Sequence, residues 1–196
     1  MKKYFVALAL FLGCTLTKAA TFYVTDISDS GPGTLRAAIL EANAAPDPPH
    51  RIEFAASFIN EGMVELLQTL PVIEVPLIID GAGKDPMIGS WEPGYSFPLL
   101  RTRASLSLIG LSMWRGVGEG VGGCVHAEHV IESIDLNIDS VTFNSCLNLT
   151  SSPSAFTRGG AVNWSSSSGE VLIRDSRFEY NDASNTSGGT AQGGAI

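Results

Sequence analysis

A run of apolar residues that recurs three times constrains this chain most strongly. In each copy apolar residues alternate, advance once by three positions (a skip of three) and alternate again, with Ser176 as the one polar residue in the pattern. The copies are Leu106, Leu108, Leu111 and Met113; Leu136, Ile138, Val141 and Phe143; and Val171, Ile173, Ser176 and Phe178. They are offset by 30 residues and then by 35, and a shorter copy precedes them at residues 77–81. Periods of this length are typical of solenoids, propellers and other repeat arrays.

The spacing inside each copy predicts two short strands that meet at a corner. Side chains at alternate positions of a strand share one face, so the alternating residues point inward. The skips of three predict corners at Ile109-Gly110, Asp139-Ser140 and Arg174-Asp175. Tight hairpin turns are scarce, because Asp80-Gly81 is the only Asp-Gly or Asn-Gly pair in the repeat region. The pattern therefore favours parallel stacking, with Leu136 and Val171 directly over one another.

A second recurring element is a pair of glycines followed by a small and then a branched residue. Its copies are Gly122-Gly123-Cys124-Val125, Gly159-Gly160-Ala161-Val162 and Gly193-Gly194-Ala195-Ile196. Glycines allow a positive φ at a turn and close approach of neighbouring backbones.

Other positions between the strand pairs predict corners and loops. Phe143 and Phe178 are each followed three residues later by a predicted corner, at Cys146 and Asn181. The stretches 147–158 and 182–192 are rich in Ser, Thr, Asn and Gly, which predicts loops.

Residues 20–76 predict an N-terminal cap, ahead of repeats at 77–196. Thr21 to Thr25 is a short strand, and Thr34 is a suitable N-cap for a helix from Leu35 to Asn43. The helix has one apolar stripe, formed by Leu35, Ala38, Ile39 and Ala42. A helix this short is marginal alone, so it should cover the open first repeat. Short strands are expected at 52–54, 63–67 and 77–79.

Residues 1–19 predict a secretory signal peptide, with two lysines, a short apolar run and small residues before a cleavage site after Ala19. An alternative is lipoprotein-type processing at Cys14. Cleavage after Ala19 leaves 9 basic against 20 acidic residues, a net charge of −11. Nucleic acid is therefore excluded as a partner, because binding phosphates requires clustered Lys and Arg.

Cys124 and Cys146 form either a disulfide in an oxidising exterior or two buried free thiols. With Glu128 and Glu132 nearby, Cys124, His126 and His129 are the one cluster that resembles metal ligands. If the segment is extended, Cys124 and His126 share a face while His129 lies on the other. We therefore predict no metal site and no cofactor.

Polar and aromatic side chains outside the core suggest other sites. Asp135, Asn137 and Asp139 point outward, but the next repeat places Glu170, Leu172 and Arg174 opposite them. This predicts an Asp139–Arg174 ion pair in place of a catalytic wall of carboxylates. The three tryptophans, which could stack on sugars, are predicted as core or corner residues: Trp91, Trp114 and Trp164.

Two features resemble known families. The opening, with Thr21 to Thr25, Asp29 to Ile39 and Ala42-Asn43, resembles the start of many secreted bacterial right-handed parallel β-helix proteins. The alternation of Gly-Gly-Ala-Val or Gly-Gly-Ala-Ile with Phe-x-x-Asn, at 159–162, 178–181 and 193–196, resembles the chlamydial polymorphic outer membrane proteins. The second tetrapeptide is complete only at Phe178 to Asn181, because Phe143 leads to Cys146 and Met113 leads to Gly116.

The resemblance implies an all-β fold, a right-handed parallel β-helix with an N-terminal capping helix. It further implies an autotransporter passenger, either secreted or on the outer membrane, that adheres to a protein or glycan of a host or cell surface without catalysis. We expect a chain truncated at Ile196, with membrane association only through a missing C-terminal region. The alternatives are a secreted polysaccharide-active enzyme of pectate-lyase type, and a truncated chain without independent activity.

Overall fold

A computed structural model describes residues 19–58, 62–91, 96–128, 133–152 and 156–196. The predicted signal peptide therefore lies outside the described residues, except for Ala19. The described chain is all-β, with parallel sheets and one short α-helix, α1 (Leu35–Ala44). A single turn of 3₁₀ helix, η1 (Ala56–Phe58), follows the second strand. All strand pairings in the described part are parallel, as the predicted absence of hairpins requires.

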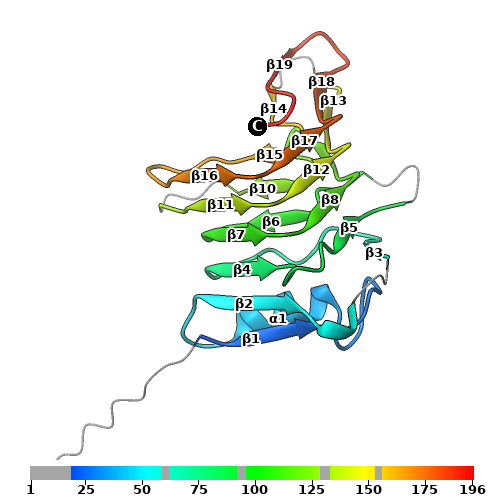
Figure 1. Ribbon diagram of the computed structural model, residues 1–196. Helices are drawn as coiled ribbons and strands as arrows, with labels where there is room; N and C mark the ends of the chain where they lie inside the picture. The colour runs from blue at the N-terminus through cyan, green and yellow to red at the C-terminus, as the bar shows by residue number, and fades with distance from the viewer. Residues whose placement is uncertain (1–18, 59–61, 92–95, 129–132, 153–155) are drawn as a thin grey trace, which may run out of the picture.

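The strands form two large sheets. In Figure 1 the strands of the six-stranded sheet lie one above another, from β1 at one end to β16 at the other. Its strands, in spatial order, are β1 (Thr21–Val24), β2 (His50–Phe54), β4 (Leu77–Asp80), β7 (Leu106–Ile109), β11 (Leu136–Asp139) and β16 (Val171–Arg174). The five-stranded sheet comprises β3 (Met63–Glu65), β5 (Met87–Gly89), β8 (Ser112–Trp114), β12 (Thr142–Asn144) and β17 (Arg177–Glu179).

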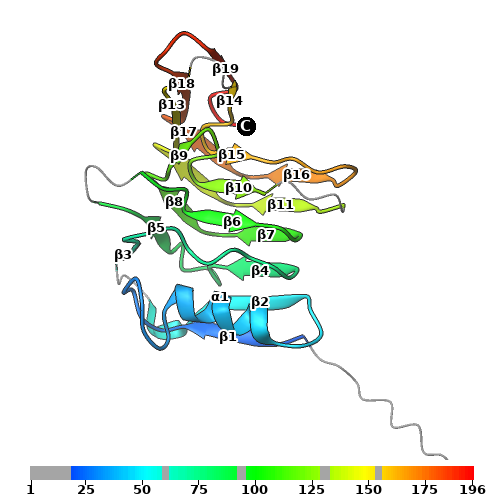
Figure 2. The ribbon, with the colours of Figure 1, turned by 180° about the vertical axis from the view of Figure 1, so that it is seen from behind.

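Three smaller sheets complete the described part. One, seen from behind in Figure 2, contains β6 (Leu100–Thr102), β10 (Val125–Ala127) and β15 (Val162–Asn163). Another contains β9 (Val117–Glu119), β13 (Leu147–Thr150) and β18 (Asp182–Asn185). The last pairs β14 (Phe156–Arg158) with β19 (Thr190–Gln192). Neighbouring strands in every sheet thus come from successive repeats of the chain.

The predicted register is confirmed. Leu136 pairs with Leu106 on one side and with Val171 on the other. In the five-stranded sheet Phe143 pairs with Met113 and with Phe178, and the two phenyl rings stack with centroids 4.9 Å apart. The alternating residues of the second copy are all buried, as predicted for side chains that point inward. Val171, by contrast, is 46% exposed, because β16 has a neighbour on one side only among the described strands.

The corners between the two large sheets fall where the skips of three predicted them. Gly110, Ser140 and Asp175 have positive φ of 55°, 57° and 47°, so the same left-handed bend recurs in each repeat. The second set of predicted corners is wrong by one residue. There the left-handed residues are Ser145 and Tyr180, with φ of 55° and 53°.

Cys146 and Asn181 lie just after this second corner and have other roles. Cys146 is buried. The Asn181 side chain joins two repeats, because its Oδ1 accepts from the Cys146 amide at 2.9 Å and its Nδ2 donates to the Phe143 carbonyl at 3.1 Å. The role of Asn181 therefore comes from its side-chain amide, which both donates and accepts a hydrogen bond, and not from its tolerance of a left-handed backbone conformation.

The glycine pairs stack on one another. The Gly123 amide donates to the Gly160 carbonyl at 2.8 Å, and the Ala161 amide donates to the Ala195 carbonyl at 2.9 Å. A Cβ atom at Gly160 would lie 2.5 Å from the carbonyl oxygen of Asp182. The second glycine of the pair is thus required by close backbone approach, while the first has positive φ at Gly159 and Gly193 (57° and 67°) but not at Gly122.

The prediction of loops at 147–158 and 182–192 is wrong. These stretches contain β13, β14, β18 and β19, which pair across repeats. The inward side chains of β13 are Asn148 and Thr150, both buried, whereas Leu147 and Leu149 are only partly buried. Backbone pairing extends the sheets here, because main-chain hydrogen bonds do not depend on apolar side chains.

The N-terminal cap agrees with the prediction. The Thr34 hydroxyl accepts from the Ala37 amide at 3.2 Å and begins α1. The apolar stripe of the helix is buried in the same core as β1 and β2. Figure 1 shows α1 beside these two strands at one end of the molecule, where it covers the end of the core.

Replacing the buried Phe143 by alanine should destabilise the protein by about 3–5 kcal/mol, through lost burial and the cavity that remains. Chemical denaturation of the two proteins measures this difference. Thr142→Ala, at the adjacent outward position, is the matched control and should change stability by less than about 0.5 kcal/mol. A loss below about 1 kcal/mol for Phe143→Ala would contradict the inward register.

Candidate functional site

The candidate site lies on the outer face of the five-stranded sheet. Ile88, Met113 and Phe143 point into the core, so the residues on either side of each point outward. Two outward rows result from the register. Met87, Ser112 and Thr142 form the first row, and Gly89, Trp114 and Asn144 form the second.

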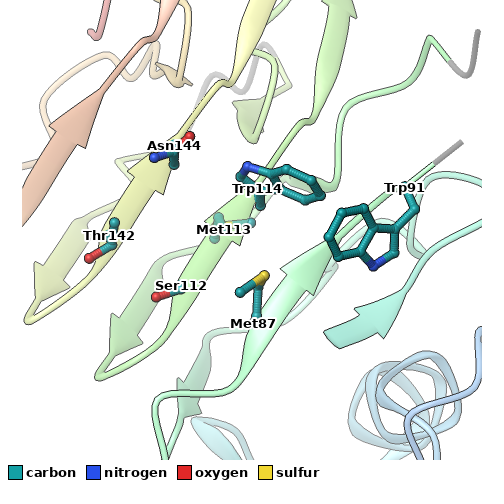
Figure 3. Close-up of a pocket in the computed structure, with 7 residues that line it drawn as sticks. All are labelled: Met87, Trp91, Ser112, Met113, Trp114, Thr142 and Asn144. Atoms are coloured by element: carbon teal, nitrogen blue, oxygen red, sulfur yellow. The ribbon is translucent and has the colours of Figure 1, made fainter. Parts of the chain in front are cut away.

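Gly89 gives the second row its shape. It has no side chain, so nothing from β5 projects beside the Trp114 ring. A Cβ at Gly89 would also collide with the carbonyl oxygen of Trp114. The chain that leaves β5 then brings Trp91 against Trp114, with ring centroids 4.4 Å apart and planes inclined at 68°. Figure 3 shows the two indoles side by side at the edge of the pocket.

The pocket has a volume of about 240 Å³. Met87, Trp91 and Trp114 provide its apolar surface, and Ser112, Thr142 and Asn144 line the polar side. Met113 also borders the pocket, although its side chain is buried in the core. Trp91 is 54% exposed and Met87 is 39% exposed. Exposed large apolar side chains that gather in a hollow mark an interaction site more often than a structural one.

Arg115 fixes the relative position of the two tryptophans. It occupies the left-handed corner after β8, with φ of 55°. Its guanidinium carbon lies 5.2 Å from the centre of the Trp114 ring, and its Nη1 donates to the Trp91 carbonyl at 3.3 Å. Both contacts hold the Trp91 segment against the sheet through one side chain.

Two of the polar side chains that line the pocket donate hydrogen bonds to neighbouring carboxylates. The Ser112 hydroxyl donates to Asp85 Oδ1 at 2.9 Å, and Asn144 Nδ2 donates to Glu179 Oε2 at 3.3 Å. The Thr142 hydroxyl has no hydrogen bond to any part of the chain that the structure describes. The pocket thus offers the Thr142 hydroxyl and the second N–H of the Asn144 amide to a ligand.

The tryptophans were predicted as core or corner residues, and this is wrong for Trp91 and Trp114. Trp164 does pack against the core. The alternation that places Met113 inward also places Trp114 outward, so the sequence contained a signal for Trp114. Trp91 lies outside the repeated pattern, and no comparable signal marks it.

The metal-like cluster is dispersed in the structure. Cys124 is bonded to Cys146, which removes it as a ligand. Glu128 forms ion pairs with Arg101 and Arg103. His129 and Glu132 lie outside the described residues, and in the remainder no group of three potential ligands gathers.

His126 lies on β10, paired with Arg101 and Asn163 of the neighbouring strands. Burial, together with the positive charge of Arg101, lowers the pKa of His126 below its usual value, against the opposing effect of Glu128. The imidazole is therefore neutral at pH 7.

The outward carboxylates of β11 have the partners that the register predicted. Arg174 Nη2 lies 3.3 Å from Asp139 Oδ2, which confirms the predicted ion pair. Asn137 pairs with Leu172, and Asp135 Oδ1 accepts from the Glu170 amide at 2.9 Å. The row therefore serves to join β11 to β16.

Comparison with protein-family models, with curated proteins and with solved structures found no match. Among the described residues, none of the helices has the length and apolar character needed to cross a bilayer.

The disulfide joins the segment that enters β10 to Cys146, which lies between the second corner and β13, with Cα atoms 5.5 Å apart. Its sulfur atoms belong to buried residues. Because the bond closes a sequence separation of 22 residues, replacing both cysteines by alanine should lower stability by about 3 kcal/mol.

Denaturation with and without reductant tests this prediction. Reductant should lower the midpoint of the unmodified protein and leave that of the double variant unchanged. Mass measurement after alkylation under denaturing, non-reducing conditions should show no labelled cysteine in the mature chain. Two labelled cysteines would mean that the bond does not form.

Proposed function

We propose that this chain is an exported, passenger-type adhesin that binds a protein or glycan on a host or other cell surface and catalyses no reaction. We further propose that its scaffold is a right-handed parallel β-helix. Parallel pairing of successive repeats, with left-handed corners at equivalent positions, supports that architecture. The hand follows from the resemblance and from the general rule for parallel crossovers.

The pocket on the five-stranded sheet is the observation that carries the proposal. Trp91 and Met87 expose a large apolar surface that contributes little to the core, and a monomeric protein gains nothing in stability from such exposure. The pocket is also preorganised. Every lining residue except Trp91 comes from strands in fixed register, and Arg115 contacts the Trp114 ring and the Trp91 carbonyl. Preorganised aromatic groups are the usual energetic centres of binding surfaces.

Charge and polar partners support binding over cleavage. A mature charge of −11 opposes contact with nucleic acid and anionic lipid. A polysaccharide-cleaving site requires carboxylates available to the substrate. Asp139 forms an ion pair with Arg174, and Asp135 accepts a hydrogen bond from the Glu170 backbone amide. These two carboxylates therefore have partners within the protein.

Replacing Trp91 by alanine should reduce attachment of the purified mature protein to cultured epithelial cells at least about tenfold, because exposed aromatic anchors contribute disproportionately to binding. Titration of labelled protein onto cells, with the bound fraction measured by flow cytometry, provides the measurement. Tyr180→Ala is the matched control. It removes an aromatic side chain that is 81% exposed and lies outside the pocket, so attachment should persist. Absence of saturable attachment by the unmodified protein would overturn the proposed function.

A further inference from the structure

We propose that the tryptophan pocket binds an uncharged pyranose ring of a surface glycan. This inference rests on the proposed binding function and names the class of ligand. It follows from three properties of the pocket: the arrangement of its apolar walls, the position of its hydrogen-bonding groups and the charges around it.

The apolar walls match the C–H face of a sugar ring. Trp91 and Trp114 meet at 68°, which makes a corner with one indole on each side. Met87 completes the apolar surface, as Figure 3 shows. A pyranose presents a flat, weakly polar C–H face that packs on an aromatic ring. The hydroxyl groups around the edge of the sugar ring remain free for other contacts.

The polar groups lie where the hydroxyls of such a ring would project. Thr142 and Asn144 are two residues apart on β12, the strand next to the one that carries Trp114. The hydroxyl of Thr142 and one N–H of Asn144 remain free, as described above. An apolar peptide side chain in the same pocket would bury both groups without replacing their hydrogen bonds to water. The free-energy cost of these lost hydrogen bonds disfavours an apolar peptide ligand.

The surrounding charges favour an uncharged ligand. None of the residues that line the pocket is ionised. Asp85 and Glu179 stand just behind the polar side, bound to Ser112 and Asn144. Both nearby arginines are engaged. Arg115 contacts the Trp114 ring and the Trp91 carbonyl, and Arg177, opposite Thr142 on β17, forms an ion pair with Glu179. A sialylated, sulfated or uronic acid residue would therefore approach the Asp85 carboxylate without a free positive partner.

A glycan array provides the first test, with neutral oligosaccharides beside their sialylated and sulfated counterparts. We expect binding to neutral members, and weaker binding wherever an acidic group is added to the same core. Saturation-transfer NMR with the methyl glycoside of the terminal sugar of the best neutral member should then show transfer to C–H protons on one face of the ring.

Variants locate the interaction. Trp91→Ala should reduce affinity for the glycoside about tenfold or more, whereas Trp91→Phe should retain most of it, because a ring face remains. Thr142→Val removes the hydroxyl at constant shape and should weaken binding severalfold. Tyr180→Ala should bind as the unmodified protein does, and circular dichroism establishes that every variant is folded.

The outcomes separate this inference from the proposed function. Stronger binding to acidic than to neutral glycans would overturn the inference. Enzymatic removal of cell-surface glycans provides a second test. Attachment that depends on Trp91 but is unaffected by this treatment would also overturn the inference, because the partner would then be a protein. The proposed adhesive function would stand in that case. Glycan binding that is unchanged in Trp91→Ala would overturn the assignment of the pocket.

Discussion

In-register parallel pairing between successive repeats determines the rest of this structure. Each strand of the six-stranded sheet sets the position of the next, so that Leu106, Leu136 and Val171 lie in one line. The main-chain hydrogen bonds supply the spacing, and the inward side chains supply the apolar burial that makes the stack stable. The stacked rings of Phe143 and Phe178 show how closely one repeat must match the next.

This constraint acts on alternate residues only. The inward positions of the two large sheets are mostly apolar, whereas the outward positions have only to remain compatible with a strand. The outward rows therefore differ from repeat to repeat: Arg174 faces Asp139 in one sheet, and Gly89, Trp114 and Asn144 follow one another in another. A regular interior thus supports a surface on which binding groups are held at fixed spacings.

The same division explains what could be predicted from the sequence. Alternation and the skips of three predicted β7, β8, β11 and β12 with their register. This was possible because side chains that are buried in these strands are apolar, which can be recognised in the sequence. β13 was missed because its inward residues are Asn148 and Thr150, and backbone pairing leaves no such mark. The second corner was misplaced by one residue because Ser145 and Tyr180 adopt positive φ without being glycine or asparagine.

The candidate site was harder to predict than the fold, for a related reason. Its members come from β5, β8, β12 and the segment after β5, and only pairing across repeats brings them together. The register alone would have placed Trp114 beside Asn144 on the outer face. The position of Trp91 depends on Arg115, whose side chain reaches back from a later corner to the Trp91 carbonyl. A local sequence pattern contains no information on such a contact, so binding surfaces on stacked strands emerge only when outward residues are read across repeats.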